Sequence, residues 1–170
     1  MNKPRLRWEH DLQEVIPMDA VGANRSNGPA APGIAKQEGF GRQEMTIKAD
    51  LSRLAEVRRF TDLACRAYGF SPETSYQIKL AMSEAVANAI EHGSTTPDDP
   101  IRLQVVYEGD AIAFYVSDGG TFIEPSMLYD HDLMDERGRG LGFIELLMDD
   151  VSINPSPEGT VIRFAKRLGD

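Results

Sequence analysis

Apolar and polar residues alternate in a regular way from residue 44 onward, and the period of the alternation changes along the chain. Every second residue of 45–49 is apolar, which predicts a half-buried strand. Residues 51–69 and 71–93 then carry apolar side chains at helical spacing. The second helix has clear ends: Ser71 and Pro72 are typical of a helix start, and Gly93 of a helix stop.

The second half of the chain returns to the strand period. Residues 101–107 and 111–116 alternate on either side of a short turn, which predicts a hairpin. A helix over 141–149, a strand over 150–154 and a last strand over 160–168 follow. This order predicts an α/β fold, a two-layer sandwich whose mixed, mostly antiparallel sheet carries its helices on one face.

The chain before this pattern has a different character. Residues 20–43 are rich in Gly, Ala, Pro, Asn and Ser and show no periodicity, so they bury too little apolar surface to offset the entropy of ordering. We therefore expect residues 1–43 to form a flexible N-terminal extension and residues 44–170 to form one folded domain.

Composition narrows the classes of partner. The 170 residues carry a net charge of −9, and residues 1–43 contribute +1 of this, which leaves −10 for the remainder. Such an acidic body is poorly suited to direct nucleic-acid binding, which requires Lys and Arg to neutralise phosphates. A basic protein partner, or a nucleotide bridged by a cation, suits it better.

Neither a secretion signal nor a membrane span is evident in the sequence. The N-terminus is interrupted by charges, and no segment approaches the ~18 apolar residues of a membrane helix. The single cysteine, Cys65, lies in an apolar helical pattern and excludes both an internal disulfide and a cysteine-only metal site. We expect a cytoplasmic protein without membrane contact.

Three polar side chains share one face of the helix over 71–93. Glu84, Asn88 and His92 are four residues apart, so they project from the same side. Such a stripe is often only a solvated face. Asn has poor helical propensity, however, and an amide oxygen beside a carboxylate suits a Mg²⁺ ion that also touches phosphates. Glu84 then has the position of a general base.

Glycines accompany two further candidate elements. Asp118 ends a strand and precedes Gly119 and Gly120, which fits either an ordinary turn or a buried carboxylate that accepts a hydrogen bond from adenine's amine. Gly138, Gly140 and Gly142 lie at the entrance of the helix expected over 141–149. This run is either a flexible turn or a helix entrance whose free N–H groups bind phosphate.

The order of these motifs resembles the GHKL, or Bergerat-fold, ATP-binding superfamily over residues 44–168. The ordered set is Glu-x-x-x-Asn on a helix, Asp-x-Gly after a strand, Gly-x-Gly-x-Gly at a helix and Gly-Thr entering the last strand. Within that superfamily, SEAVANAIEHG and GRGLGFIELLMDDV look most like the anti-sigma-factor serine kinases of the RsbW and SpoIIAB type.

The resemblance implies a role for each motif residue. Asn88 would hold Mg²⁺, Glu84 would be the catalytic base and Asp118 would read the adenine of ATP. The remaining residues that the resemblance places around the nucleotide are His92, Gly120, Phe122, Gly138, Arg139, Gly140, Leu141, Gly142 and Thr160. Phe122 departs from the family pattern, which has Gly or Pro at this position of the second glycine box.

Two functions of different classes follow from the resemblance. One is an ATP-dependent protein serine kinase that binds a sigma factor and phosphorylates a STAS-type anti-anti-sigma factor, with a homodimer as one implied state. The alternative is a nucleotide-dependent module that sequesters a sigma factor or other regulator without catalysis, which Phe122 and the N-terminal extension keep open. The catalytic part of a histidine kinase is disfavoured, since no helical hairpin with a phosphoacceptor His precedes the domain.

Overall fold

The structure is a computed structural model that describes Arg7–Trp8, residues 42–120 and residues 137–169. Its elements are β1 (Arg7–Trp8), β2 (Gln43–Lys48), the 3₁₀ turn η1 (Leu51–Arg53), α1 (Leu54–Ala67), α2 (Pro72–His92), β3 (Pro100–Glu108), β4 (Ala111–Asp118), α3 (Arg137–Leu147), β5 (Asp150–Ser156) and β6 (Gly159–Arg167). None of the helices in these ranges is long and apolar enough to cross a membrane.

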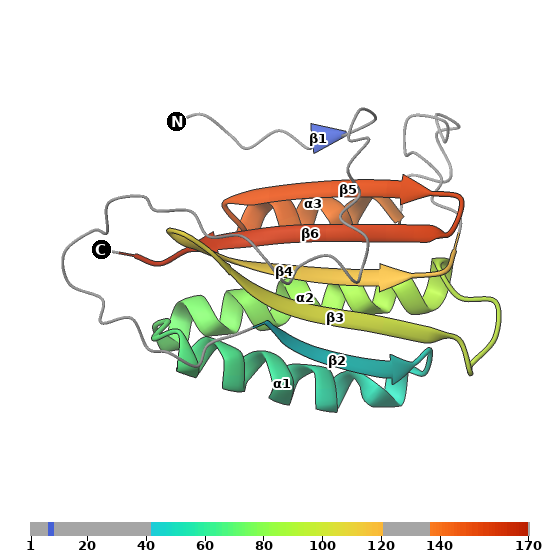
Figure 1. The fold of residues 1–170 in the computed structure, drawn as a ribbon, viewed down its shortest axis with the longest axis horizontal. Helices are drawn as coiled ribbons and strands as arrows, with labels where there is room; N and C mark the ends of the chain where they lie inside the picture. The colour runs from blue at the N-terminus through green and yellow to red at the C-terminus, as the bar shows by residue number, and fades with distance from the viewer. Residues whose placement is uncertain (1–6, 9–41, 121–136, 170) are drawn as a thin grey trace.

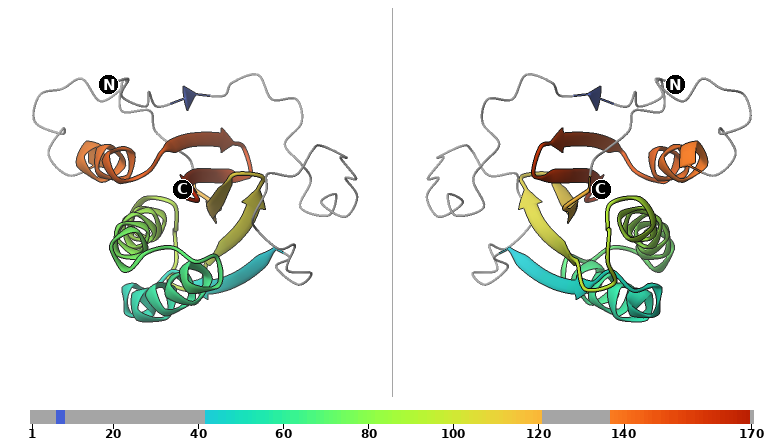
Figure 2. Two further views of the ribbon diagram at one scale, coloured as in Figure 1. Left: turned by 90° about the vertical axis from the view of Figure 1, so that its left-hand side faces the viewer. Right: turned by 90° about the vertical axis from the view of Figure 1, so that its right-hand side faces the viewer.

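The described strands form one sheet of six, in the order β1-β5-β6-β4-β3-β2. Neighbours from β5 to β2 are all antiparallel, and β1 pairs in parallel with β5 at the edge. The three helices lie together on one face of the sheet (Figures 1 and 2). This arrangement confirms the predicted two-layer sandwich with a mixed, mostly antiparallel sheet.

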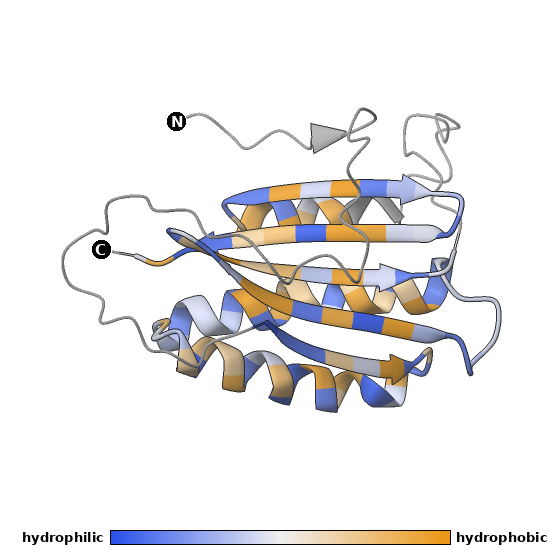
Figure 3. Ribbon diagram, viewed as in Figure 1, coloured by the Kyte–Doolittle hydropathy of each residue, from blue (hydrophilic) through white to orange (hydrophobic). Residues whose placement is uncertain are grey.

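The core fills the space between the sheet and the helices. Phe114 of β4 and Phe164 of β6 are cross-strand partners, fully buried and stacked with their ring centroids 5.6 Å apart. Ile78, Met82 and Val86 of α2 are also fully buried. Apolar and polar residues alternate along the strands in Figure 3, so the sheet presents its apolar positions to the helices.

The ends of α2 lie where the sequence predicts them. The Ser71 hydroxyl accepts a hydrogen bond from the Thr74 N–H at 3.1 Å, and Pro72 occupies the first helical position. At the other end, the Gly93 N–H donates to the Ala89 carbonyl at 3.0 Å. Because both ends are held by local contacts, the polar stripe on this helix has a fixed direction.

The helix that contains Gly138, Gly140 and Gly142 differs from the prediction. It begins at Arg137 and ends at Leu147, whereas residues 141–149 were expected. Three glycines disfavour a helix by about 1 kcal/mol each, which is why the sequence argued for a later start. Packing decides otherwise, because Gly140, ahead of the expected start, is buried against Glu84 and Asn88 of α2. The glycines therefore lie inside the first two turns of α3.

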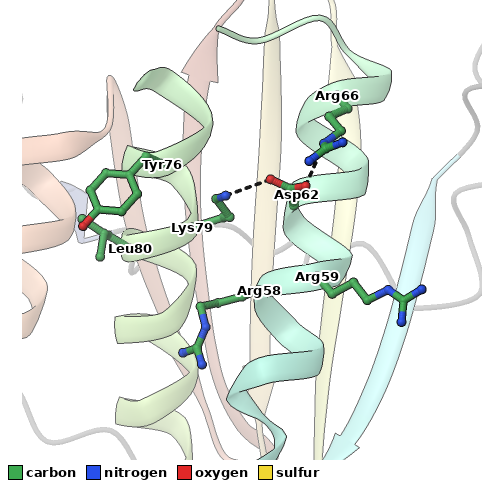
Figure 4. A pocket seen from close by; sticks show the side chains of 7 residues that line it. All are labelled: Arg58, Arg59, Asp62, Arg66, Tyr76, Lys79 and Leu80. Atoms are coloured by element: carbon green, nitrogen blue, oxygen red, sulfur yellow. Dashed lines mark hydrogen bonds and ion pairs between the residues drawn. The ribbon is translucent and has the colours of Figure 1, made fainter. Parts of the chain in front are cut away.

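A charged groove lies on the outer surface between α1 and α2 (Figure 4). Asp62 of α1 accepts a hydrogen bond from Lys79 of α2 at 2.8 Å and pairs with Arg66 at 2.8 Å. The Lys79 contact is the main reason that the pKa of Asp62 lies below its ordinary value. Exposed pairs of this kind contribute little stability, so we read Asp62 chiefly as a fixed bridge between the two helices.

The N-terminal extension is expected to be dispensable for folding. β1 contributes only two residues to the sheet edge, and the antiparallel sheet begins at Gln43. A chain shortened to start at Arg42 should therefore melt within about 5 °C of the full chain, as small surface losses do. Circular dichroism of both chains makes the comparison. A melting temperature lower by much more than this would mean that the extension packs on the domain.

Candidate functional site

One face of α2 carries the stripe predicted to be functional. Glu84 and Asn88 are half-buried, and His92 is exposed in the last turn of the helix. Ala85 and Ala89, next to them on the apolar side, are buried against the rest of the core. The stripe therefore runs along the border between the core and the surface, where side chains can be both held in place and reached by a ligand.

The first turns of α3 lie directly against Glu84 and Asn88. A Cβ added to Gly140 would lie 2.3 Å from Glu84 Oε1 and 3.0 Å from Asn88 Nδ2. No ordinary side chain fits at that separation, so the glycine allows the α3 backbone to approach the two polar groups. The structure thus brings the first and third predicted motifs together.

This end of α3 also offers free backbone donors. The first four N–H groups of a helix have no intrahelical acceptor, and in α3 those of residues 137–139 are among them. Together with the positive end of the helix dipole they suit an anion. Gly140 follows them and lets the backbone approach α2, whereas Gly142 is exposed in the second turn and the side chain of Leu141 joins the core.

Asn88 carries a buried polar atom that has no partner among the residues that the structure describes. Its Nδ2 is shielded from solvent and makes no hydrogen bond to any of them. Leaving such a group unsatisfied costs about 1–3 kcal/mol, so it is an uncommon feature for a residue with a purely structural role. Rotation of the carboxamide about its last bond exchanges the nitrogen for the oxygen, which is the atom that Mg²⁺ prefers. The residue therefore fits a metal ligand.

A metal at Asn88 would have few other protein ligands. In the part of the chain that the structure describes, no three His, Cys, Asp or Glu side chains gather as they would around an ion. This is the arrangement expected for Mg²⁺ bound with a nucleotide, because the ion then takes most of its ligands from phosphate oxygens and water.

Asp118 lies at the other end of the stripe. Its Oδ1 accepts a hydrogen bond from the Gly120 N–H at 2.8 Å, and the Thr160 N–H also donates to the carboxylate. Burial raises the pKa of Asp118 above its ordinary value, and these two hydrogen bonds offset part of the increase. The carboxylate is therefore a partly desolvated acceptor with a fixed direction.

Thr160 completes this end of the site. It faces Asp118 across the β4–β6 pair and is 4% exposed. Its hydroxyl donates to the Gly120 carbonyl at 3.3 Å. The second and fourth predicted motifs thus meet at Asp118, as the first and third meet at Gly140. Along α2, the nine residue steps from Glu84 to the cap at Gly93 rise ~14 Å, enough to line an extended nucleotide.

Two glycines near Asp118 were not assigned to the site from the sequence. A Cβ added to Gly93 would lie 2.2 Å from the Asp118 Cγ, and one added to Gly159 would lie 1.9 Å from the Asp118 carbonyl oxygen. Gly93 was interpreted as a helix stop at the end of the SEAVANAIEHG segment, and Gly159 as the glycine of the Gly-Thr motif that enters the last strand. The sequence signal available for both was a glycine next to a motif residue. The residue that each glycine contacts, Asp118, is distant from it in the sequence.

The structure does not describe two of the predicted site residues in full. Phe122 is not among the described residues, so its place at the nucleotide stays a prediction. Arg139 belongs to the first turn of α3, and its side chain is likewise outside the description.

Replacing Gly159 with Ala is expected to destabilise the domain by about 2–4 kcal/mol. The glycine has φ +143°, which side-chain-bearing residues rarely adopt, and the new Cβ would meet backbone that cannot move aside. Urea unfolding measures the loss. Gly119→Ala is the matched control, because a Cβ there meets nothing within 4 Å, and its effect should stay within about 0.5 kcal/mol. Equal effects would show that the close approach is unimportant.

Comparison with known proteins gives consistent matches. Residues 47–166 match the family model described as histidine kinase-like ATPase domain. The chain is 36% identical over 101 residues to the anti-sigma F factor of Bacillus subtilis, which covers 54% of this chain and 68% of that protein. It is 34% identical over 119 residues to the serine-protein kinase RsbW of Listeria monocytogenes, which covers 64% of this chain and 74% of that protein.

A solved structure has the same fold. The crystal structure of the RsbU and RsbW domains of a Mycobacterium tuberculosis protein superposes on 75% of this chain with a TM-score of 0.59 and 24% sequence identity. This chain spans 32% of that longer protein. At this identity the likeness concerns the fold alone.

Proposed function

Because the chain belongs to the histidine kinase-like ATPase domain family, we propose that it is an ATP-binding anti-sigma factor and protein serine kinase. The observation that supports the proposal is the meeting of Glu84 and Asn88 with Gly140 at the start of α3, where they would serve as a base and a metal ligand beside free backbone donors. A module that only binds a partner has no need of Glu84 beside the donors, so the arrangement favours catalysis.

The two parts of the nucleotide lie at opposite ends of the stripe, the adenine near Asp118 and the phosphates near the start of α3. Asp118 accepts a hydrogen bond from the adenine amine, with Gly120 and Thr160 beside it. The N–H groups of residues 137–139, together with the dipole of α3, would hold the phosphates. Asn88 would hold Mg²⁺ through its amide oxygen. Bound ATP would supply the phosphoryl group, and the metal would neutralise charge on its phosphates.

Glu84 acts on the substrate serine. Its carboxylate takes the proton from the serine hydroxyl as the serine oxygen attacks the γ-phosphorus of ATP. The bond from that phosphorus to the bridging oxygen breaks, and ADP leaves with the electron pair. The backbone of Gly140 keeps the carboxylate next to the start of α3. Little covalent chemistry is required of the protein in phosphoryl transfer, so positioning and charge neutralisation carry most of the rate.

Two protein partners belong to this function. The serine belongs to a STAS-type anti-anti-sigma factor, and the dephosphorylated form of that factor competes with a sigma factor for this chain. This partner switching regulates transcription in the cytoplasm, where both ATP and the sigma factor are available. A homodimer is part of the proposal, and light scattering of the purified chain tests it.

Two assays on the purified chain test the function. Labelled ATP and Mg²⁺ are incubated with the STAS-domain proteins of the same genome, and capture of its sigma factors is measured in parallel with and without ATP. We expect label on a serine of one STAS protein and nucleotide-dependent capture of one sigma factor. Capture without labelling of any STAS protein would reject the kinase and leave a nucleotide-dependent binding module.

A further inference from the structure

Gly93 caps α2 although its backbone does not require glycine. Helices often end in glycine because the cap residue has positive φ, but Gly93 has φ −100° and ψ −3°, which any residue adopts. Its N–H makes an ordinary helical hydrogen bond to the Ala89 carbonyl. The reason for glycine here must therefore lie in the space around it and not in its conformation.

That space is filled by the carboxylate of Asp118. A Cβ added to Gly93 would lie 2.2 Å from Cγ, 2.3 Å from Oδ1 and 2.6 Å from Oδ2. All three atoms of the carboxylate group thus lie against the bare face of the cap residue. Asp118 lies at the end of β4, so its direction depends on a residue in another layer of the fold.

Gly120 packs against the backbone of Gly93 and restricts the same contact. A Cβ added to Gly120 would lie 2.3 Å from the Gly93 Cα and 2.5 Å from its carbonyl oxygen. Gly120 is also the residue whose N–H donates to Asp118 Oδ1. The backbone of Gly93 therefore presses on both the carboxylate and the donor that orients it, so neither can shift toward the end of α2.

We propose that Gly93 is a positioning residue that sets nucleotide-base specificity by holding the Asp118 carboxylate at the angle needed to accept the adenine amine. The inference rests on the proposed function, in which Asp118 reads adenine. A methyl group at residue 93 turns the carboxylate away from Gly120 and Thr160 or pushes the end of α2 off β4. In either case the acceptor oxygen leaves its place, and guanine, whose oxygen the carboxylate repels, is rejected less strongly.

The experiment uses the full chain in four forms: wild type, Gly93→Ala, Asp118→Ala and the double variant. Calorimetry gives the affinity of each for ATP and for GTP with Mg²⁺. We expect Gly93→Ala to weaken ATP binding at least ~10-fold and to reduce the preference for ATP over GTP. In the Asp118→Ala background the same change should alter ATP affinity by less than ~3-fold, because the group on which it acts is gone.

The matched control is Gly119→Ala, which adds a methyl group where nothing lies within 4 Å. It should leave both affinities and the preference for ATP unchanged. Melting without nucleotide shows which variants fold. If Gly93→Ala does not fold, the double variant becomes decisive, since removing the carboxylate also removes the clash, and it should regain a cooperative melt.

Several results would overturn the inference. An equal loss of ATP and GTP affinity in Gly93→Ala would mean a general structural role, and so would an equal loss of ATP affinity in both backgrounds. An unfolded double variant would show that Gly93 is required for reasons other than Asp118. Wild-type chain that binds no ATP would instead reject the proposed function, so the two failures are distinguishable.

Discussion

Replacing Glu84 with Gln is expected to slow phosphoryl transfer to the STAS serine by about 100- to 10,000-fold while ATP affinity changes little. Gln keeps the size of Glu but cannot take the proton of the attacking hydroxyl. The carboxylate lies against Gly140 at the start of α3, and the neutral amide fits the same space. Transfer is measured with labelled ATP, and affinity by calorimetry on the same preparation.

Asn88→Ala is expected to fail in a different way. It removes the proposed metal ligand, so ATP affinity with Mg²⁺ and the transfer rate should fall together. Without Mg²⁺, the variant and the wild type should bind ATP with similar affinity. The unliganded variant should remain well folded, because the change deletes a buried nitrogen that has no hydrogen-bond partner.

Ser83→Ala is the matched control for both variants. Ser83 precedes Glu84 on α2, and its hydroxyl only donates back to the Lys79 carbonyl at 2.8 Å. Its removal should change the transfer rate by less than ~2-fold, as expected for a position away from the chemistry. A Glu84→Gln variant that transfers at the wild-type rate would keep the kinase but reject Glu84 as its base.

The sequence predicted α2 well because its signals are local. The cap at Ser71, Pro72 behind it and the spacing of the apolar residues all lie within one segment, so no distant contact is needed to interpret them. The stripe of Glu84 and Asn88 follows from the helical period alone. The first of the four motifs that carried the resemblance to the ATP-binding superfamily lies on this helix, and the family match over residues 47–166 confirms that resemblance.

The start of α3 was misplaced because local and tertiary effects disagree there. Helical propensity argues against a helix through Gly138, Gly140 and Gly142, whereas burial of Gly140 against α2 favours it. Only the packed structure shows that the close approach to Glu84 needs Gly140 inside the helix. That these glycines take part in binding stays a prediction, but the structure gives Gly140 a spatial reason as well as a conformational one.

The contacts around Asp118 could not be obtained from the sequence at all. Gly93, Gly120 and Gly159 come from three segments, and only the fold brings them to one carboxylate. Periodicity and turn signals describe one segment at a time, so they could mark each glycine but not their common partner. The same holds for the raised pKa of Asp118, whose main cause is burial by neighbours from other elements.

Asp118→Asn is expected to weaken ATP binding by about 10- to 100-fold. The amide keeps the size of the carboxyl group, but it replaces one acceptor oxygen with a donor that faces the adenine amine. The remaining oxygen can still accept the hydrogen bond from Gly120. Calorimetry gives the affinity, and the thermal shift caused by ATP should be smaller in the variant than in the wild type.

The same substitution should stabilise the unliganded chain in a pH-dependent way. The folded pKa of Asp118 is raised above 3.8, so in the window above 3.8 the folded chain binds more protons than the unfolded chain. Stability from this group is therefore lost as the pH rises through the folded pKa, and at neutral pH the buried charge is unfavourable. Asn carries no charge, so the free energy of unfolding of the variant relative to the wild type should increase from about pH 4 to pH 7.

Together these results separate a binding role for Asp118 from a structural one. Weaker ATP binding combined with equal or greater unliganded stability at pH 7 is expected only when the carboxylate is kept, at a cost in stability, for a ligand. If the variant loses stability at pH 7, Asp118 is mainly a strand-end residue that holds Gly120 and Thr160 in place. If ATP affinity is unchanged, the adenine is recognised elsewhere, and the positioning role inferred for Gly93 loses its basis as well.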